Sequence, residues 1–209
     1  MNNVIKILSN NKDYRMVVID TKKIIERELA EFKGSPLVRN VMKRFITNCV
    51  LLSGIHDFKQ KISVSLRLSA NMSFYCLIAD RSIHSEYNEA GCDNEADLFD
   101  CQSILAVTTG DWQTGIYTGT VKAQMDDMDM IFSHYMMQSE QIYGRFMTGK
   151  KNIHRGCVYQ ILPFADETNI QKEDQKLSYL LEELECADWL DVPKIYDPVG
   201  TVVFETKIE

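Results

Sequence analysis

The chain has 209 residues, of which 45% are hydrophobic and 25% are charged, and its formal net charge is -7. This length allows one large domain, or one domain with a tail, and a core that needs no disulfide or metal. The acidic balance disfavours nucleic acid as a main partner, because no Lys/Arg cluster is large enough to neutralise several phosphates. No apolar stretch approaches the roughly 20 residues that span a bilayer, and no secretory core opens the chain. We therefore expect a cytoplasmic protein without a membrane partner.

The first elements are a predicted hairpin and two helices. The apolar runs Val4-Leu8 and Tyr14-Asp20 flank turn residues and predict two paired strands. Thr21-Phe32 has helical spacing of its apolar residues. A second helix opens at Ser35-Pro36, since serine caps free N–H groups and proline suits the first helical position. This helix is apolar on much of its surface, which predicts burial between two layers, and Gly54 is its expected end.

The middle of the chain predicts antiparallel strands. Residues 61–69 alternate between apolar and polar side chains, which is typical of a strand with one buried face. Further strands are predicted at residues 73–79, 83–87, 103–109 and 114–121.

The last third predicts a helix over residues 126–142, a buried strand over 157–162 and an amphipathic helix over 171–186. The order of elements favours an α+β fold in which antiparallel sheet layers pack with helices. We expect a core domain over residues 1–189. Residues 190–209 are linker-like in composition and predict an arm that contains one short strand at 201–209.

The sequence contains no complete catalytic or metal-binding constellation. The acidic loop at residues 93–97 begins like a calcium loop, but Leu98 stands where the tight turn needs glycine. None of the four histidines pairs with another His or a Cys at metal-ligand spacing. Cys157 with His154 is a weak candidate for a catalytic pair, because sequence adjacency is poor support for such pairs. We expect no catalytic residue, no cofactor and no metal ligand in this chain.

Two further groups have simple structural interpretations. Asp126, Asp127 and Asp129 suit the positive end of a helix dipole better than catalysis. Cys92 and Cys101 bracket the acidic loop and would pair only under oxidation, since cytosolic structural disulfides are uncommon. The six cysteines include no Cys-x-Cys and no Cys-x-x-Cys, which favours buried free thiols.

Methionine is concentrated in one segment, with five of the ten methionines between residues 125 and 137. Core packing along a helix explains most of them, because methionine fills irregular gaps. Met130 and Met137 lie off the main apolar face of the predicted helix, which favours an adaptable apolar surface for varied partners. We therefore predict a client-binding or interface surface made of Met130, Met136, Met137, Leu177, Leu180, Leu181 and Leu184.

One segment is not explained by amphipathicity. Tyr135-Ile142 reads Tyr-Met-Met-Gln-Ser-Glu-Gln-Ile, which resembles the Tyr-Phe-x-Gln-Ser-Glu-Gln-Ile helix of the 33-kDa heat-shock chaperonin family (HslO). Other segments are similar to that family in the same order, namely Asp20-Thr21, Ser35-Pro36, Leu51-Gly54, Lys61-Leu66, Tyr117-Gly119 and Gly156-Pro163. The chain departs from the family at residues 70–73, where Ala-Asn-Met-Ser replaces a Gly-Pro turn, and at Tyr143-Gly144, which replaces Pro-Ser.

The resemblance implies a fold and a function. It implies an N-terminal core domain of this family, a homodimer, and an ATP-independent holdase that binds exposed apolar segments of unfolding client proteins under heat or redox stress. Family members bind zinc through a C-terminal module with Cys-x-Cys and Cys-x-x-Cys. The sequence at hand ends about where that module would begin, so we expect no zinc/thiol switch within it.

Two alternatives from other classes stay open. One is a small cytosolic enzyme with a single reactive cysteine, such as Cys157. The other is an interaction domain that recognises one specific partner.

Overall fold

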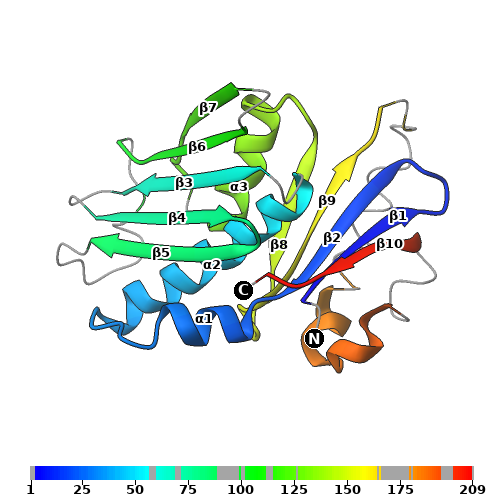
Figure 1. Cartoon of the computed structure of the whole chain (residues 1–209), viewed down its shortest axis with the longest axis horizontal. Coiled ribbons are helices and arrows are strands. Elements are labelled where there is room, and N and C mark those ends of the chain that lie inside the picture. Colours follow the sequence, from blue (N-terminus) through cyan, green and yellow to red (C-terminus); the bar gives the residue numbers. More distant parts are fainter. Residues whose placement is uncertain are drawn as a thin grey trace.

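The computed structural model describes residues 3–56, 60–68, 72–88, 99, 102–111, 115–125, 127–163, 165, 179, 181–193 and 200–208. Two five-stranded antiparallel sheets dominate the molecule, and helices lie between them (Figure 1). This arrangement confirms the predicted α+β fold of antiparallel sheet layers packed with helices.

The first sheet combines both ends of the chain. Its strand order is β10 (Gly200–Thr206), β1 (Val4–Ser9), β2 (Tyr14–Asp20), β9 (Arg155–Ile161) and β8 (Gly144–Thr148). β1 and β2 form the predicted hairpin, and β10 pairs with the other side of β1. The strand at Gly200–Thr206 confirms the short strand expected near the end, while the boundary at residues 189 and 190 stays a prediction.

The second sheet has the strand order β5 (Ser82–Asn88), β4 (Ser73–Ala79), β3 (Lys61–Arg67), β6 (Ile104–Asp111) and β7 (Gly115–Lys122). It joins the meander β3-β4-β5 to the hairpin β6-β7, which pairs with the other side of β3. The inward residues of β3, Ile62, Val64 and Leu66, are at most 1% exposed, as the alternating pattern predicted. The other face of β3 is polar and at least partly exposed.

The long helix α2 (Pro36–Ile55) holds the two sheets together. It begins as predicted, because the Ser35 hydroxyl accepts a hydrogen bond from Val38 N–H. Its side chains belong to one core cluster with residues from both sheets, which confirms the predicted burial between layers. Gly54 lies inside the helix and does not end it: a Cβ there would come within 2.5 Å of Val17, so the absence of a side chain admits close packing on β2.

Two shorter helices complete this layer. α1 (Lys22–Glu28) is shorter than predicted and lies beside β5. The Glu28 carboxylate accepts hydrogen bonds from the N–H and hydroxyl of Ser85, which ties α1 to that strand. α3 (Met128–Gln138) packs on β8 and β7 and contacts α2.

The opposite face of the first sheet has its own apolar cluster. Tyr14, Met16 and Val18 of β2 pack there with Leu184, Trp189 and Val192. Residues 181–192 thus cover the side of this sheet that faces away from α2 (Figure 1). Residues 181–186 are helical, in agreement with the predicted amphipathic helix, while residues 171–178 lie outside the described part.

Candidate functional site: a methionine-lined groove

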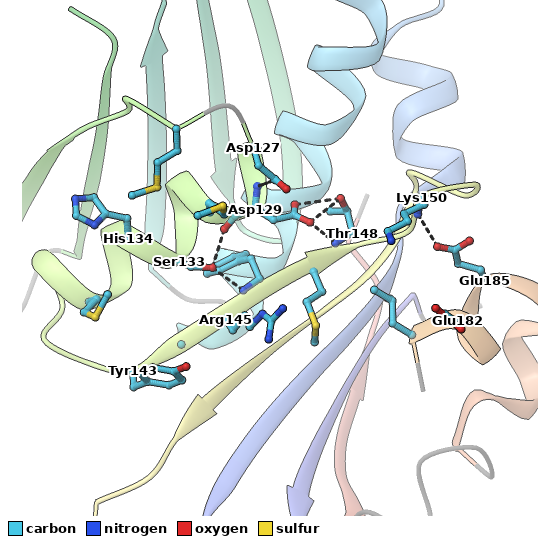
Figure 2. Close-up of a pocket in the computed structure, with 17 residues that line it drawn as sticks. Asp127, Asp129, Ser133, His134, Tyr143, Arg145, Thr148, Lys150, Glu182 and Glu185 are labelled. Carbon is cyan, nitrogen blue, oxygen red and sulfur yellow. Dashed lines mark hydrogen bonds between the residues drawn. The ribbon is translucent and has the colours of Figure 1, made fainter. Parts of the chain in front are cut away.

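A groove of about 510 Å³ opens between α3, β8 and the helical residues 181–185 (Figure 2). Its apolar lining includes Met125, Met130, Met137, Tyr143, Met147 and Leu181. Met130 is 55% exposed and Met137 is 51% exposed, although both are large apolar side chains. The two methionines are seven residues apart on α3, so they lie on the same side of the helix.

The structure divides the predicted surface residues into groups. Met130, Met137 and Leu181 line this one groove. Met136 and Leu184 do not belong to a surface in this structure, because they are 1% and 0% exposed. Met136 follows Phe132 by one helical turn and joins the central core, whereas Leu184 packs on the first sheet. Leu177 and Leu180 lie outside the residues whose side chains are described.

Sequence reasoning missed the strand that forms the groove floor. β8 is only five residues long and was not predicted, so Tyr143 and Met147 were not linked to the methionines of α3. The sequence signal for this strand was the short apolar pair Phe146-Met147 after Gly144. In the structure these two side chains are buried on opposite faces of the sheet.

Asp129 fixes α3 to this strand. Its carboxylate accepts hydrogen bonds from Thr148 N–H at 2.6 Å, from the Thr148 hydroxyl at 3.0 Å and from the Asn48 side-chain amide at 2.9 Å. Three elements, α2, α3 and β8, therefore meet at one carboxylate. Burial raises the pKa of Asp129 above its ordinary value, although the hydrogen bonds from Asn48 and Thr148 oppose this rise.

Ser133 continues the same attachment. Its hydroxyl accepts a hydrogen bond from Phe146 N–H at 2.9 Å and donates one to the Asp129 carbonyl at 2.7 Å (Figure 2). The N–H groups of Phe146 and Thr148 on the outer edge of β8 are therefore both taken up by α3 side chains. These two bonds partly cover the edge of the first sheet.

Charged residues surround the apolar lining. Asp127 caps α3, since its side chain accepts a hydrogen bond from Asp129 N–H at 2.8 Å. For Asp127, this contact confirms the interpretation as a helix-start residue. Glu185 accepts hydrogen bonds from the N–H groups of Lys150 and Lys151, which holds the C-terminal helical residues against the loop that follows β8.

The segment with the family resemblance, Tyr135-Ile142, forms the last turn of α3 and then a corner beside the groove. The helix ends at Gln138, so the prediction of helix to Ile142 was wrong, and Gln141 adopts a positive φ of 56°. The Tyr135 hydroxyl donates to Glu140 at 2.6 Å, and burial together with this carboxylate raises the pKa of Tyr135.

The strand β7 closes on this corner. The Tyr117 hydroxyl lies 3.1 Å from the Ser139 hydroxyl, and a Cβ at Gly119 would fall 1.9 Å from the same Ser139 oxygen. Two separate segments of the resemblance, Tyr117-Gly119 and Gln138-Gln141, therefore meet in space. Their residue types are explained by packing.

The cysteines and histidines do not assemble into a reactive centre among the described residues. Cys49, Cys76 and Cys157 are buried, and Cys186 is exposed. Burial, with a contact to Cys76, raises the pKa of Cys49 well above its ordinary value. Burial lowers the pKa of His154, which Asp20 partly opposes. Cys92, Cys101 and the acidic loop lie outside the described part of the chain.

Within the described residues, no group of three His, Cys, Asp or Glu side chains is placed to hold a metal ion. No helix in the same part of the chain has both the length and the apolar character to cross a membrane.

Comparisons with known proteins agree with the sequence resemblance. A family model described as Hsp33 protein matches residues 2–198. No curated protein matches the chain. Among solved structures, the chain is similar to the crystal structure of the 33 kDa chaperonin (heat shock protein 33 homologue) from Thermotoga maritima, with a TM-score of 0.69 and 16% identity. The alignment covers 100% of this chain and 80% of that chain, and at this identity it shows a shared fold.

Proposed function

This chain belongs to the Hsp33 family of chaperones, and from that premise we propose that it acts as an ATP-independent holdase core. It binds exposed apolar segments of unfolding proteins in the cytoplasm and so prevents their aggregation. The observation that supports this proposal most directly is the groove beside α3, where Met130 and Met137 are half-exposed in the folded protein.

The chemistry of the groove suits varied apolar clients. Methionine is unbranched and polarizable, so its side chain adapts to partners of different shape. Exposed apolar side chains that gather in one hollow mark interaction sites more often than scattered ones. The hydrogen bonds of Asp129 and Ser133 to β8 give these flexible side chains a rigid base.

Aggregation of a heat-denaturing client tests the proposal. The chain should suppress light scattering of a thermolabile enzyme such as citrate synthase without ATP. The variant M130Q/M137Q should suppress it less, because glutamine keeps the length of methionine but makes the groove polar. I116Q is the matched control, since Ile116 is 82% exposed on β7 and lies outside the groove. No suppression by the wild-type chain, reduced or oxidised, would refute the proposal.

We also propose that these 209 residues act without a zinc/thiol switch. The spacing of the six cysteines supports it, because none lies in a Cys-x-Cys or Cys-x-x-Cys pair. Zinc-bound thiolates serve as switches because they are both metal ligands and oxidisable groups.

We also propose that the chain forms a homodimer, as the family resemblance implies. The C-terminal strand β10, which pairs with β1, is an element that two copies can exchange. Light scattering at micromolar concentration should give twice the chain mass of 24.1 kDa. A mass equal to one chain would contradict the dimer but leave the holdase function standing.

The alternatives receive less support. An enzyme that uses Cys157 would need an accessible thiolate, and Cys157 is 0% exposed in the strand β9. An interaction domain with one specific partner would show a single stoichiometric partner in a pull-down and no protection of generic clients.

A further inference from the structure

The groove carries an excess of negative charge around its methionines. Four carboxylates and two permanent cations line it: Asp127, Asp129, Glu182, Glu185, Arg145 and Lys150. The Asp129 carboxylate already accepts hydrogen bonds from Thr148 and Asn48 at the base of the groove. The three remaining carboxylates lie at the groove and come from both of its helical walls (Figure 2).

The contacts of these carboxylates leave their charge in place. Asp127 accepts the N–H of Asp129, and Glu185 accepts the N–H groups of Lys150 and Lys151. A backbone N–H is a neutral donor, so it orients a carboxylate without cancelling its charge. Glu182 is exposed at the groove next to Leu181. The net charge of -7 on the whole chain reinforces the local potential.

We propose that this groove selects apolar segments flanked by Lys or Arg over equally apolar segments flanked by Asp or Glu. The inference rests on the proposed holdase function and names the client chemistry for that site. The methionines take the apolar residues of the segment, while Asp127 and Glu182 face its basic flanks. An acidic flank meets like charge at the same positions, which costs binding free energy.

The expected preference is modest and depends on salt. An exposed ion pair contributes only a small amount, so two such pairs give about a tenfold difference in affinity between basic and acidic flanks. Screening reduces the interaction of exposed charges at high ionic strength. The preference should therefore be clear at low salt and weak at high salt, whereas the apolar part of the binding persists.

Two fluorescent peptides with the same apolar centre test the inference. One carries lysines on both flanks and the other carries glutamates, and fluorescence anisotropy gives the affinity of each for the full chain at low and high salt. The variant D127N/E182Q removes two charges from the groove. It should preserve the fold, because asparagine caps a helix as well as aspartate and Glu182 is exposed. E26Q/E31Q is the matched control, since it removes two exposed carboxylates outside the groove.

The proposal predicts a clear pattern. The lysine-flanked peptide binds about tenfold more tightly at low salt, D127N/E182Q removes most of that preference, and E26Q/E31Q keeps it. M130Q/M137Q weakens binding of both peptides, which locates them in the groove.

Three results would overturn the selectivity: equal affinity for both peptides at low salt, a preference that E26Q/E31Q reduces as much as D127N/E182Q does, or binding that M130Q/M137Q leaves unchanged. Equal peptide binding with client protection intact would remove the selectivity alone. Absence of both peptide binding and client protection would remove the holdase function as well.

Discussion

The Asp129 side chain links α3 to two other elements. Its carboxylate accepts from the Thr148 backbone and from the Asn48 side chain, so it joins β8 and α2 to the helix that carries the exposed methionines. When the acceptor is removed, a buried donor remains without either the acceptor or water. The loss of stability is therefore larger than the net contribution of the hydrogen bond. The D129A substitution should therefore lower the free energy of unfolding by about 3 kcal/mol, as measured by urea denaturation.

The raised pKa of Asp129 adds a pH dependence. Because burial raises this pKa, the native state binds the proton more tightly than the unfolded chain does. The contribution of this group to stability is therefore fully present below the unfolded pKa of about 3.9, and it falls as pH rises through the higher native value. The difference in the free energy of unfolding between the wild type and D129N should therefore decrease as pH rises from the unfolded pKa to the native pKa of Asp129. A difference that increased with pH would contradict the assignment, and E26Q gives the baseline for an exposed carboxylate.

The thiols should differ sharply in reactivity. Cys186 is exposed, whereas Cys49, Cys76 and Cys157 are buried, and a raised pKa keeps Cys49 protonated. Among the four described cysteines of the native protein, a thiol reagent should modify Cys186 first and reach the three buried ones only when the structure opens. Mass-spectrometric peptide mapping measures this order for each peptide, and in C186S none of the other described cysteines should react fast. Labelling of Cys157 as fast as that of Cys186 would revive the reactive-cysteine enzyme.

At the scale of elements, the corner after α3 shows how a sequence motif can encode packing. The chain leaves the helix after Gln138, and Ser139 then meets β7 where Gly119 has no side chain. The contact joins the edge strand of the second sheet to the helix that lines the groove.

The G119A substitution tests this contact. Its Cβ would fall 1.9 Å from the Ser139 hydroxyl oxygen, so the variant should be destabilised by about 1–3 kcal/mol. The double variant G119A/S139A should recover part of the loss, because the remaining Ser139 carbon is 3.0 Å from that Cβ. Thermal unfolding of the four proteins in the cycle gives the coupling energy. T120A is the control on the same strand, and additive effects of the two substitutions would rule out the proposed contact.

At the scale of the whole molecule, one buried helix organises both sheets. α2 places its side chains in a core shared with strands of each sheet, so the molecule has a central layer that neither sheet could form alone. The C-terminal residues then cover the far face of the first sheet. Both walls of the groove, α3 and residues 181–185, are thereby anchored to the first sheet.

The proposed absence of a zinc/thiol switch leads to a prediction at this scale. Protection of a client should be the same for the reduced chain, the peroxide-treated chain and the chelator-treated chain. The reason is that the described thiols are mostly buried and the sequence has no closely spaced cysteine pair. Aggregation assays run in parallel on the three preparations measure this. Activity that appeared only after oxidation or metal removal would show that these residues contain a switch.

Local patterns predicted much of this architecture. The alternation in β3, the cap at Ser35 and the apolar surface of α2 each reflect interactions between residues near one another in the chain, so they are readable without a fold. The resemblance centred on Gln138-Gln141 identified the family, and the family comparison confirms it. The predictions were wrong at two helix ends, which depend on contacts with distant residues. Gly54 continues α2 because it packs on Val17, and α3 ends at Gln138, before the predicted end.

The sequence by itself determined the α+β composition, the burial of α2 and the family, because periodicity and motif residues are properties of short segments. Helical spacing in the sequence already placed Met130 and Met137 off the apolar face, but only the tertiary structure showed that Met136 is buried. Met136 and Met137 are neighbours in the chain, yet one is 1% exposed and the other 51%. Met136 packs in the central core, whereas Met137 lines a groove whose other wall, residues 181–185, is held by contacts between segments far apart in the chain, such as that of Glu185 with Lys150.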